Sequence, residues 1–348
     1  MPEQPFPKLR HSSDSEPGFT RKRIGTHWAY FDEKGERITD REVIDRLNAL
    51  GLPPAYTNAW FCADPNGHLQ ATGIDARGRK QYRYHADFRA TAEASKFAGL
   101  LEFGKALPKL RRTVQKHLNQ RRLNREAVLA AVVRLLDTAY LRIGNEQYAK
   151  ENKSFGATTL LSRHVRETGQ KLKMRFKGKH GIVREVTITD RRLGRVVRRC
   201  QELPGQALFQ YLNGHGEPQQ ISSADVNDYI REATGGEFTA KHFRTWGASV
   251  IAIEQLLDAE EGQKVSVNTM IEPVAEALGN TVAISRKSYV HPALVEAAKE
   301  RPRDPLPGIE RPAARKWLSA AEVGLLEFLK GQSRPRRKRA KDRVLNVA

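Results

Sequence analysis

The sequence predicts an α+β protein, with a small, mostly β domain at the N-terminus and a larger, mainly helical domain that contains a small antiparallel β insertion. Three observations support this fold class. Short β-prone runs separated by turn residues fill residues 21–88, whereas apolar residues at helical spacing dominate residues 89–300. Residues 171–189 return to a period of two. A chain of 348 residues also exceeds the size that one hydrophobic core usually supports.

The β-rich domain is predicted from its turns. Asp-Glu-Lys-Gly at residues 32–35 and Asp-Pro-Asn-Gly at residues 64–67 separate runs of aromatic and β-prone residues. A helix over about residues 40–50 interrupts these runs. The predicted strands cover residues 26–31, 59–61, 68–72 and 79–84.

Both ends of the chain are expected to lie outside the two domains. Residues 1–20 carry prolines and charges without an apolar run, so we expect a disordered leader and no signal peptide. Residues 301–348 are predicted to form a Pro-rich and basic tail with a short helix at about residues 319–330. The basic cluster at residues 334–339 is expected to add non-specific affinity for phosphate.

The last predicted strand of the β-rich domain interleaves cations and aromatic residues. It would place Arg79 and Gln81 on one face and Lys80, Tyr82 and Tyr84 on the other. Arginine, lysine and glutamine can reach base edges and phosphates, and tyrosine offers a planar ring with a hydroxyl at its tip. The segment therefore indicates either a nucleic-acid contact or a solvated edge strand with a half-buried tyrosine pair.

The larger domain is predicted from apolar residues at helical spacing and from helix caps. The β insertion consists of two strands joined by a turn at residues 178–181, and a second turn is expected at residues 191–194. The predicted helices cover residues 86–103, 108–120, 125–141, 223–233, 239–258, 268–278 and 286–300, the last one interrupted at Pro292.

The charge balance points to a polyanionic partner. The formal net charge is +20 and the sequence pI is about 10.1, which favours a phosphate backbone. An anionic membrane is the rival partner, but no run of about eighteen apolar residues occurs. The two cysteines, Cys62 and Cys200, are too few for a disulfide scaffold and fit a reduced cytosol.

Several common chemistries lack their motifs. No His-Glu-x-x-His or Cys-x-x-Cys spacing supports a metal site, and no Gly-x-Ser-x-Gly elbow supports a serine hydrolase. Residues 99–105 approach the phosphate-loop pattern, but Ala106 replaces the required hydroxyl and the interior is apolar, which argues against ATP binding. A tyrosine with several basic residues remains as the candidate chemistry.

Four blocks carry this chemistry in a specific order, and their order and motifs make the signal strong. They are Leu141–Asn152 with Arg-x-Gly, Lys177–Lys179 with Lys-Gly-Lys, Lys241–Gly247 with Arg-Thr-Trp-Gly, and Gly279–Asn280 followed by Ser288–Tyr289. The ordered set resembles a type IB DNA topoisomerase of the small poxvirus and bacterial kind. Residues 78–84 are similar to the DNA-contacting strand of that family, so the resemblance covers about residues 21–300.

The resemblance implies a role for each residue. Tyr289 would attack a phosphodiester and form a 3′-phosphotyrosyl link, while Arg142 and Arg244 would meet the negative charge that develops on the phosphoryl oxygens. Lys179 would protonate the departing 5′ oxygen, and Lys241, three residues before Arg244, would be a proton relay. Residues 21–88 would be a DNA-binding domain and residues 89–300 the catalytic domain.

Two departures from the poxvirus pattern qualify the resemblance. Asn280 stands where poxvirus and eukaryotic enzymes have a histidine, and an amide can donate a hydrogen bond but cannot carry charge. Asn145 and Gln147 replace lysines of the poxvirus enzymes, although the DNA contact implied for Tyr148 is retained. We therefore expect Asn280 to act as a neutral donor, and a cleavage preference unlike that of poxvirus enzymes.

The implied function is relaxation of supercoiled duplex DNA without ATP, metal or another cofactor. The implied enzyme is a monomer in the cytoplasm, associated with the nucleoid and not with a membrane. A tyrosine recombinase is the first alternative, since it uses similar residues to exchange strands within a tetramer. A non-enzymatic architectural DNA-binding protein is the second, because it would explain the net charge but not the ordered blocks.

Overall fold

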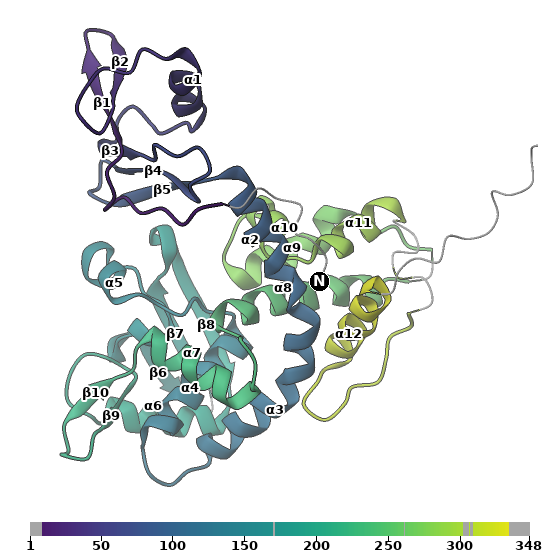
Figure 1. Ribbon diagram of the computed structural model, residues 1–348. Helices are drawn as coiled ribbons and strands as arrows, with labels where there is room; N and C mark the ends of the chain where they lie inside the picture. Colours follow the sequence, from purple (N-terminus) through teal and green to yellow (C-terminus); the bar gives the residue numbers. More distant parts are fainter. Residues whose placement is uncertain (1–8, 170, 261, 302–305, 307–308, 334–348) are drawn as a thin grey trace, which may run out of the picture. The chain divides into compact units, whose positions relative to one another are not determined.

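A computed structural model describes residues 9–169, 171–260, 262–301, 306 and 309–333. The chain divides into two compact units, residues 1–96 and 97–348, and the boundary falls inside helix α2 (Ala86–Ala98). Figure 1 shows a sheet-containing N-terminal part and a larger part built mostly of helices. The predicted α+β class is therefore confirmed, with the division about eight residues later than expected.

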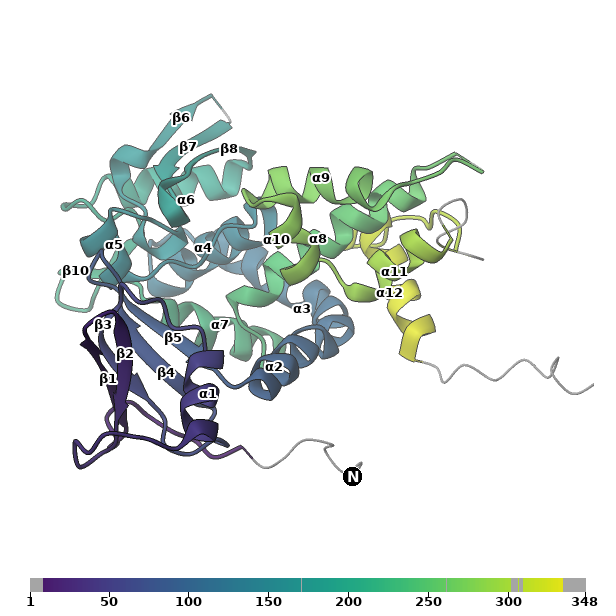
Figure 2. The same cartoon turned by 90° about the horizontal axis from the view of Figure 1, so that it is seen from above.

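The first unit is built on a five-stranded antiparallel sheet with the order β2-β1-β3-β4-β5, labelled in Figures 1 and 2. One helix, α1 (Arg41–Ala49), begins after the cap Asp40. Its buried Leu47 joins a small core with Tyr30 and Phe61. The strands are β1 (Phe19–Ile24), β2 (His27–Phe31), β3 (Thr57–Phe61), β4 (Leu69–Ile74) and β5 (Lys80–Tyr84).

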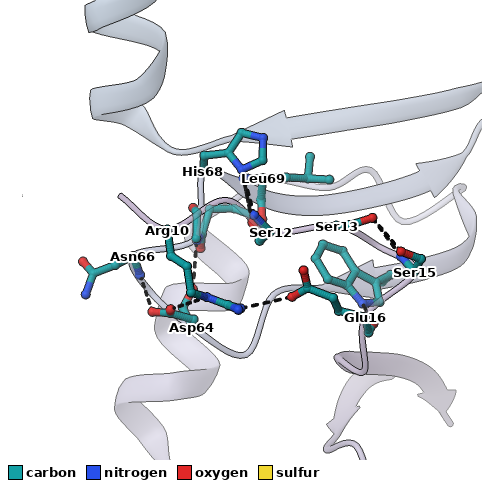
Figure 3. Close-up of polar contacts among 12 residues, drawn as sticks. Arg10, Ser12, Ser13, Ser15, Glu16, Asp64, Asn66, His68 and Leu69 are labelled. Carbon is teal, nitrogen blue, oxygen red and sulfur yellow. Dashed lines mark hydrogen bonds and ion pairs between the residues drawn. The ribbon is translucent and has the colours of Figure 1, made fainter. Parts of the chain in front are cut away.

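The expectation of a disordered leader is wrong for residues 10–20. Arg10 forms a parallel bridge with Gly67, and the backbone N–H of Ser12 donates to Nδ1 of His68 at 3.0 Å. The buried Ser12 hydroxyl also donates to the carbonyl of Leu69 (Figure 3). The turn before β4 thus satisfies the polar groups of this segment, which composition alone could not indicate. Residues 1–8 of the expected leader lie outside the described residues.

The second unit surrounds α8 (Ala240–Leu257), most of whose residues are buried. Figure 2 shows α8, α9 and α10 as neighbours, and α8 also packs against α3, α4 and α12. The other helices are α3 (Leu100–Leu118), α4 (Arg125–Ala139), α5 (Glu146–Asn152), α6 (Arg191–Gln201), α7 (Ser223–Thr234), α9 (Val267–Leu278), α10 (Val282–Ser288), α11 (Pro292–Glu300) and α12 (Ala320–Ser333).

The β insertion forms a three-stranded antiparallel sheet with the order β6-β7-β8. Leu172, Met174 and Phe176 alternate with exposed cations along β7, so one face is buried against the helices, as the period of two predicted. The strands are β6 (Val165–Thr168), β7 (Lys171–Lys177) and β8 (Val183–Thr189), and a separate pair is β9 (Gln210–Leu212) with β10 (Pro218–Gln220).

Three predicted helix boundaries are corrected. Helix α3 runs through Pro108 without the expected break, because the buried Phe103, Leu107 and Leu110 form one continuous stripe. The expected turn at residues 191–194 is the first turn of α6, where the Asp190 side chain accepts hydrogen bonds from two backbone N–H groups.

The third correction concerns the segment that carries Tyr289. Pro292 separates α10 from α11, because it occupies the first turn of α11, where its missing N–H costs nothing. Helix α10 is capped by Thr281, and Ser285 lies inside it. Tyr289 therefore follows the end of a helix instead of beginning one.

The predicted C-terminal helix is present as α12, and it is part of the core of the second unit. Its Glu322 accepts two hydrogen bonds from Arg111, at 2.8 and 2.6 Å, and one from Nε1 of Trp246 at 3.0 Å. Arg111 also forms two 2.8 Å bonds to Asp137 on α4. Residues 334–339 of the expected tail lie outside the described residues.

Candidate active site

Arg244 lies at the centre of the candidate site. It is on α8 and only 5% exposed, and its guanidinium donates to the carbonyl of Tyr140 and, at 3.2 Å, to that of Leu278. The guanidinium carbon lies 4.8 Å from the centroid of the Tyr289 ring. The arginine and the tyrosine, 45 residues apart in sequence, are thus in contact.

Burial, together with the nearby charges of Arg142 and Arg184, lowers the pKa of Arg244 from 12.5 to about 10, although Tyr289 opposes the change. Among the described residues, no carboxylate forms an ion pair with any of these three arginines. The site is therefore a cluster of cations whose protein partners are neutral. Such a cluster favours an anion.

Arg142 is placed by two facing glycines. It follows α4 and precedes Gly144, whose φ of +104° favours glycine. A Cβ on Gly156 would lie 2.6 Å from the carbonyl oxygen of Arg142 and equally close to the backbone of Gly144. That carbonyl accepts a hydrogen bond from the N–H of Ala157 at 2.8 Å. The Arg-x-Gly block therefore allows two backbone segments to approach closely and fixes the arginine at their junction.

Asn280 is held at the end of α9 and faces Arg142. The helix ends at Gly279, with φ of +60°, and the backbone N–H of Asn280 donates to the carbonyl of Ala275. Nη2 of Arg142 donates to Oδ1 of Asn280 at 2.9 Å. Nδ2 of Asn280 and Nε of Arg244 are buried donors without a partner among the described residues. A bound anion could accept hydrogen bonds from both.

Tyr289 is half-buried and fixed through its backbone. Its N–H donates to the carbonyl of Ser285, and the N–H of His291 donates to Oγ of Ser249 on α8, both at about 3 Å. Helix α8, which carries Arg244, therefore also anchors the segment directly after Tyr289. The tyrosine is positioned by both neighbouring turns of chain.

Arg184 is a site residue that the sequence did not indicate. It lies on β8, and its guanidinium donates to the carbonyls of Glu276 and Ala277 at the end of α9. Burial and then the charge of Arg142 lower the pKa of Arg184. The strand pattern offers no local signal for this contact, because it depends on how the hairpin packs against α9.

The two predicted lysines are exposed and are not brought into contact with the arginine cluster. Lys179 lies in the turn between β7 and β8, and Lys241 lies in the first turn of α8. The structure gives neither lysine a hydrogen bond or an ion pair within the part of the chain that it describes. Tyr148 on α5 is also exposed, to 48%.

The predicted DNA-contacting strand is β5, and its polar side chains already have partners within the first unit. Nε of Arg79 and Nε2 of Gln81 both donate to Oδ2 of Asp75, at 2.9 and 3.0 Å. The hydrogen bond from Arg79 lowers the pKa of Asp75 to about 2. Lys80 forms an ion pair with Asp14.

The tyrosines of β5 are exposed instead. Tyr82 and Tyr84 are 46% and 37% exposed, and their rings stack with centroids 6.2 Å apart and planes 12° apart. Phe88 extends the row at 5.4 Å from Tyr84. The predicted alternation therefore places both tyrosines on one accessible face, where a base or sugar could stack.

The described part of the chain holds neither a metal-binding cluster nor a membrane-spanning helix. No group of three or more His, Cys, Asp or Glu side chains is placed to hold a metal ion. No described helix is long and apolar enough to cross a membrane.

Comparison with protein families gives two matches that together cover most of the chain. The family described as "Eukaryotic DNA topoisomerase I, catalytic core" matches residues 85–304, and "Bacterial DNA topoisomerase IB, N-terminal domain" matches residues 27–75. The boundary between the matches lies close to β5 and α2.

Individual relatives agree with the family matches. The chain is 33% identical over 298 residues to DNA topoisomerase 1B of Acanthamoeba polyphaga mimivirus, covering 82% of this chain and 88% of the relative. It is 21% identical over 232 residues to DNA topoisomerase 1B of Vaccinia virus (strain Copenhagen), covering 66% and 72%. Among solved structures, a post-cleavage complex of the XerH site-specific recombinase matches with a TM-score of 0.37 at 17% identity, covering 56% of this chain and 50% of that one.

Proposed function

The chain belongs to the type IB DNA topoisomerase family, and from this premise we propose how its own residues cut and reseal DNA. The observation that carries the proposal is the contact of Tyr289 with Arg244, within a cluster of arginines that no described carboxylate neutralises. An anion is the missing partner, and the phosphodiester of duplex DNA supplies it.

In the cleavage step, the Tyr289 hydroxyl oxygen attacks the phosphorus. A bond forms from that oxygen to phosphorus, and the bond from phosphorus to the 5′ oxygen breaks. The products are a 3′-phosphotyrosyl link and a free 5′ hydroxyl, which reverses the reaction when it attacks the link. Because one ester replaces another, neither ATP nor a metal is required by the balance of the reaction.

Arg142 and Arg244 stabilise the negative charge of the transition state on the non-bridging oxygens. The two unpartnered donors, Nε of Arg244 and Nδ2 of Asn280, are available for these oxygens. Because Nη2 of Arg142 donates to Oδ1 of Asn280, the amide is oriented with its donor, Nδ2, turned away from Arg142. A neutral amide thus suffices where poxvirus and eukaryotic enzymes have a histidine.

Lys179 protonates the departing 5′ oxygen, and Lys241 relays the proton. Both lysines are exposed, so we expect DNA binding to bring them to the phosphate. Tyr82 and Tyr84 offer stacking faces, and Tyr148 adds a further contact. Arg79, Lys80 and Gln81 can exchange their present acidic partners for phosphates.

We further propose that the enzyme acts as a monomer on duplex DNA in the cytoplasm, at the nucleoid. The match to a bacterial N-terminal domain supports this location. Family membership favours relaxation over recombination, because the family enzymes act on DNA topology.

The test is relaxation of supercoiled plasmid in EDTA without ATP, comparing the wild type with Tyr289→Phe. We expect relaxation by the wild type and none by the variant, and trapped adducts should carry the protein on the 3′ end. Equal relaxation by both proteins, or a 5′ adduct, would overturn the proposal. Strand exchange between two labelled duplexes without relaxation would identify a recombinase, and binding without cleavage an architectural protein.

A further inference from the structure

Arg184 occupies the junction between the β7-β8 hairpin and the end of α9. Its two terminal nitrogens donate to the carbonyls of Glu276 at 3.3 Å and Ala277 at 2.8 Å. These carbonyls belong to the last turn of α9, where backbone acceptors have no partner within the helix and a cation is favoured. The side chain thus joins two elements that are about 90 residues apart in sequence.

Two glycines make room for this side chain. A Cβ on Gly279 would clash with the guanidinium and Cδ of Arg184, and a Cβ on Gly178 would lie 3.2 Å from its Cγ. Gly178 directly precedes Lys179, and Gly279 directly precedes Asn280. One side chain therefore contacts the residue before the proposed proton donor and the residue before the proposed amide donor.

The turn that carries Lys179 is also held by backbone hydrogen bonds: the N–H of Gly181 donates to the carbonyl of Gly178 at 3.1 Å, and the N–H of Phe155 donates to the carbonyl of Lys177, just before the turn, at 2.8 Å. Its backbone is closed by the N–H of Gly178 donating to the carbonyl of Ile182 at 2.7 Å, and Ile182 and Val183 are about half exposed. The neighbouring Arg175 and Glu185 form an ion pair on the outer face of the hairpin, with both side chains at least 70% exposed. Within the described part of the chain, the Arg184 fork is the polar contact that ties this end of the hairpin to α9.

We propose that Arg184 is a positioning residue that holds the Lys179 turn against the end of α9, so that Lys179 and Asn280 serve the same phosphate. The inference rests on the proposed function. Arg184 acts on the leaving oxygen through Lys179 and does not itself donate the proton. Its removal should therefore mimic the loss of Lys179.

The experiment is single-turnover cleavage of a duplex oligonucleotide with either oxygen or sulfur at the bridging 5′ position. A thiolate leaves without protonation, so the sulfur substrate does not need the general acid. We expect Arg184→Ala and Lys179→Ala to cleave the oxygen substrate about 10²-fold more slowly than the wild type, and the sulfur substrate within about 5-fold of it. Arg142→Ala should be slow on both substrates. Cleavage of the sulfur substrate also shows that the Arg184→Ala variant is folded.

Three further variants sharpen the result. Arg184→Lys keeps the charge but cannot span both carbonyls, so it should fall between Arg184→Ala and the wild type on the oxygen substrate. Arg175→Ala removes an exposed arginine of the same hairpin and should match the wild type. The double variant Lys179→Ala with Arg184→Ala should be less than about 3-fold slower than Lys179→Ala alone, because both changes remove one function.

Other outcomes would overturn the inference. If sulfur does not rescue Arg184→Ala while it rescues Lys179→Ala, Arg184 acts on the phosphate or on the fold instead of on the lysine. Full activity of Arg184→Lys would show that charge alone matters. A wild type that cleaves neither substrate would refute the proposed function itself, whereas unimpaired Lys179→Ala would refute only the proton donor and, with it, the positioning role.

Discussion

Two arginines of the helical unit, Arg244 buried and Arg111 mostly buried, have opposite surroundings. Arg111 on α3 is bonded by the carboxylates of Asp137 and Glu322, and these partners raise its pKa despite burial. Arg244 on α8 donates to two backbone carbonyls and has no carboxylate partner among the described residues, and burial together with Arg142 lowers its pKa to about 10. The guanidinium of Arg111 is therefore paired with carboxylates, whereas that of Arg244 has no described counter-ion.

The comparison distinguishes an arginine that stabilises the fold from one whose charge is available to a substrate. A buried cation costs free energy unless an anion accompanies it, and around Arg111 the protein supplies that anion itself. Around Arg244 the described residues supply no carboxylate, so the free energy of the folded state is higher than it would be with one nearby. On the proposed function, the phosphate of the substrate would lower this free energy, and would lower it most in the transition state, when the phosphoryl oxygens carry more charge.

The largest effect is expected for Arg244→Gln. It removes the cation but keeps donors for the carbonyls of Tyr140 and Leu278, so single-turnover cleavage should fall about 10³-fold, equivalent to about 4 kcal/mol. The thermal midpoint should change by less than about 2 °C, because no ion pair is broken. Rapid-quench cleavage and calorimetry measure the two effects, and a large fall in the midpoint would show that Arg244 is structural like Arg111.

The converse change is Arg111→Met, which leaves the carboxylates of Asp137 and Glu322 without their cationic partner. We expect a loss of about 3 kcal/mol in the free energy of unfolding, measured in urea, with little change in cleavage rate by the folded fraction. The control is the triple variant that adds Asp137→Asn and Glu322→Gln, which should recover a large part of the loss. A triple variant as unstable as the single one would show that the charges are not the cause.

A partly buried histidine extends the comparison, because its side chain loses its proton on folding instead of keeping a charge. Burial lowers the pKa of His291 from 6.5 to about 4, and its Nδ1 accepts the N–H of Ala293 at the start of α11. The unfolded chain takes up a proton as the pH falls below about 6.5, whereas the folded chain does so only near pH 4. The stabilising contribution of the neutral ring is thus complete above pH 6.5 and is lost towards pH 4.

The variant His291→Asn keeps a side-chain acceptor for the N–H of Ala293 but has no group that titrates. Between pH 6.5 and 4 it should lose about 2 kcal/mol less stability than the wild type, allowing for the partial exposure of the ring. Urea titrations at several pH values measure this difference. Parallel pH profiles for the two proteins would show that the histidine does not titrate on unfolding.

The smallest effect is stabilisation by a free anion. Millimolar sulfate should raise the thermal midpoint of the wild type by about 3 °C more than that of Arg244→Gln, because sulfate binds the folded cluster and not the unfolded chain. Arg111→Met should keep the wild-type response. An equal rise in all three proteins would indicate a general salt effect and no anion site at Arg244.

The sequence indicated the residues proposed for this site, but not the contacts that surround them. Arg142, Arg244, Asn280 and Tyr289 lie in short blocks with recognisable neighbours, and the structure brings all four together. Some neighbours have a visible physical purpose. Gly247 leaves room for the Tyr140 ring, whose backbone carbonyl accepts the bond from Arg244.

What the sequence could not predict depends on contacts between distant segments. Arg184 looks like an ordinary member of an alternating strand until the hairpin is packed against α9. Asp14 lies in a segment with the composition of a disordered leader, yet it pairs with Lys80 and is bonded by the Thr72 hydroxyl at 2.9 Å. In both cases the interaction joins residues more than 50 positions apart, and a local pattern carries no trace of it.

The bond between Glu322 and Trp246 has a consequence for the timing of synthesis. Trp246 lies two residues after Arg244, so the helix that carries this proposed catalytic arginine lacks the bond to Glu322 until residues 320–333 have left the ribosome. Until then Arg111 also lacks one of its two carboxylates. A nascent chain that has already made Tyr289 would thus still have an incomplete core around α8, so the fold around the proposed catalytic residues is completed only after all of them have been translated.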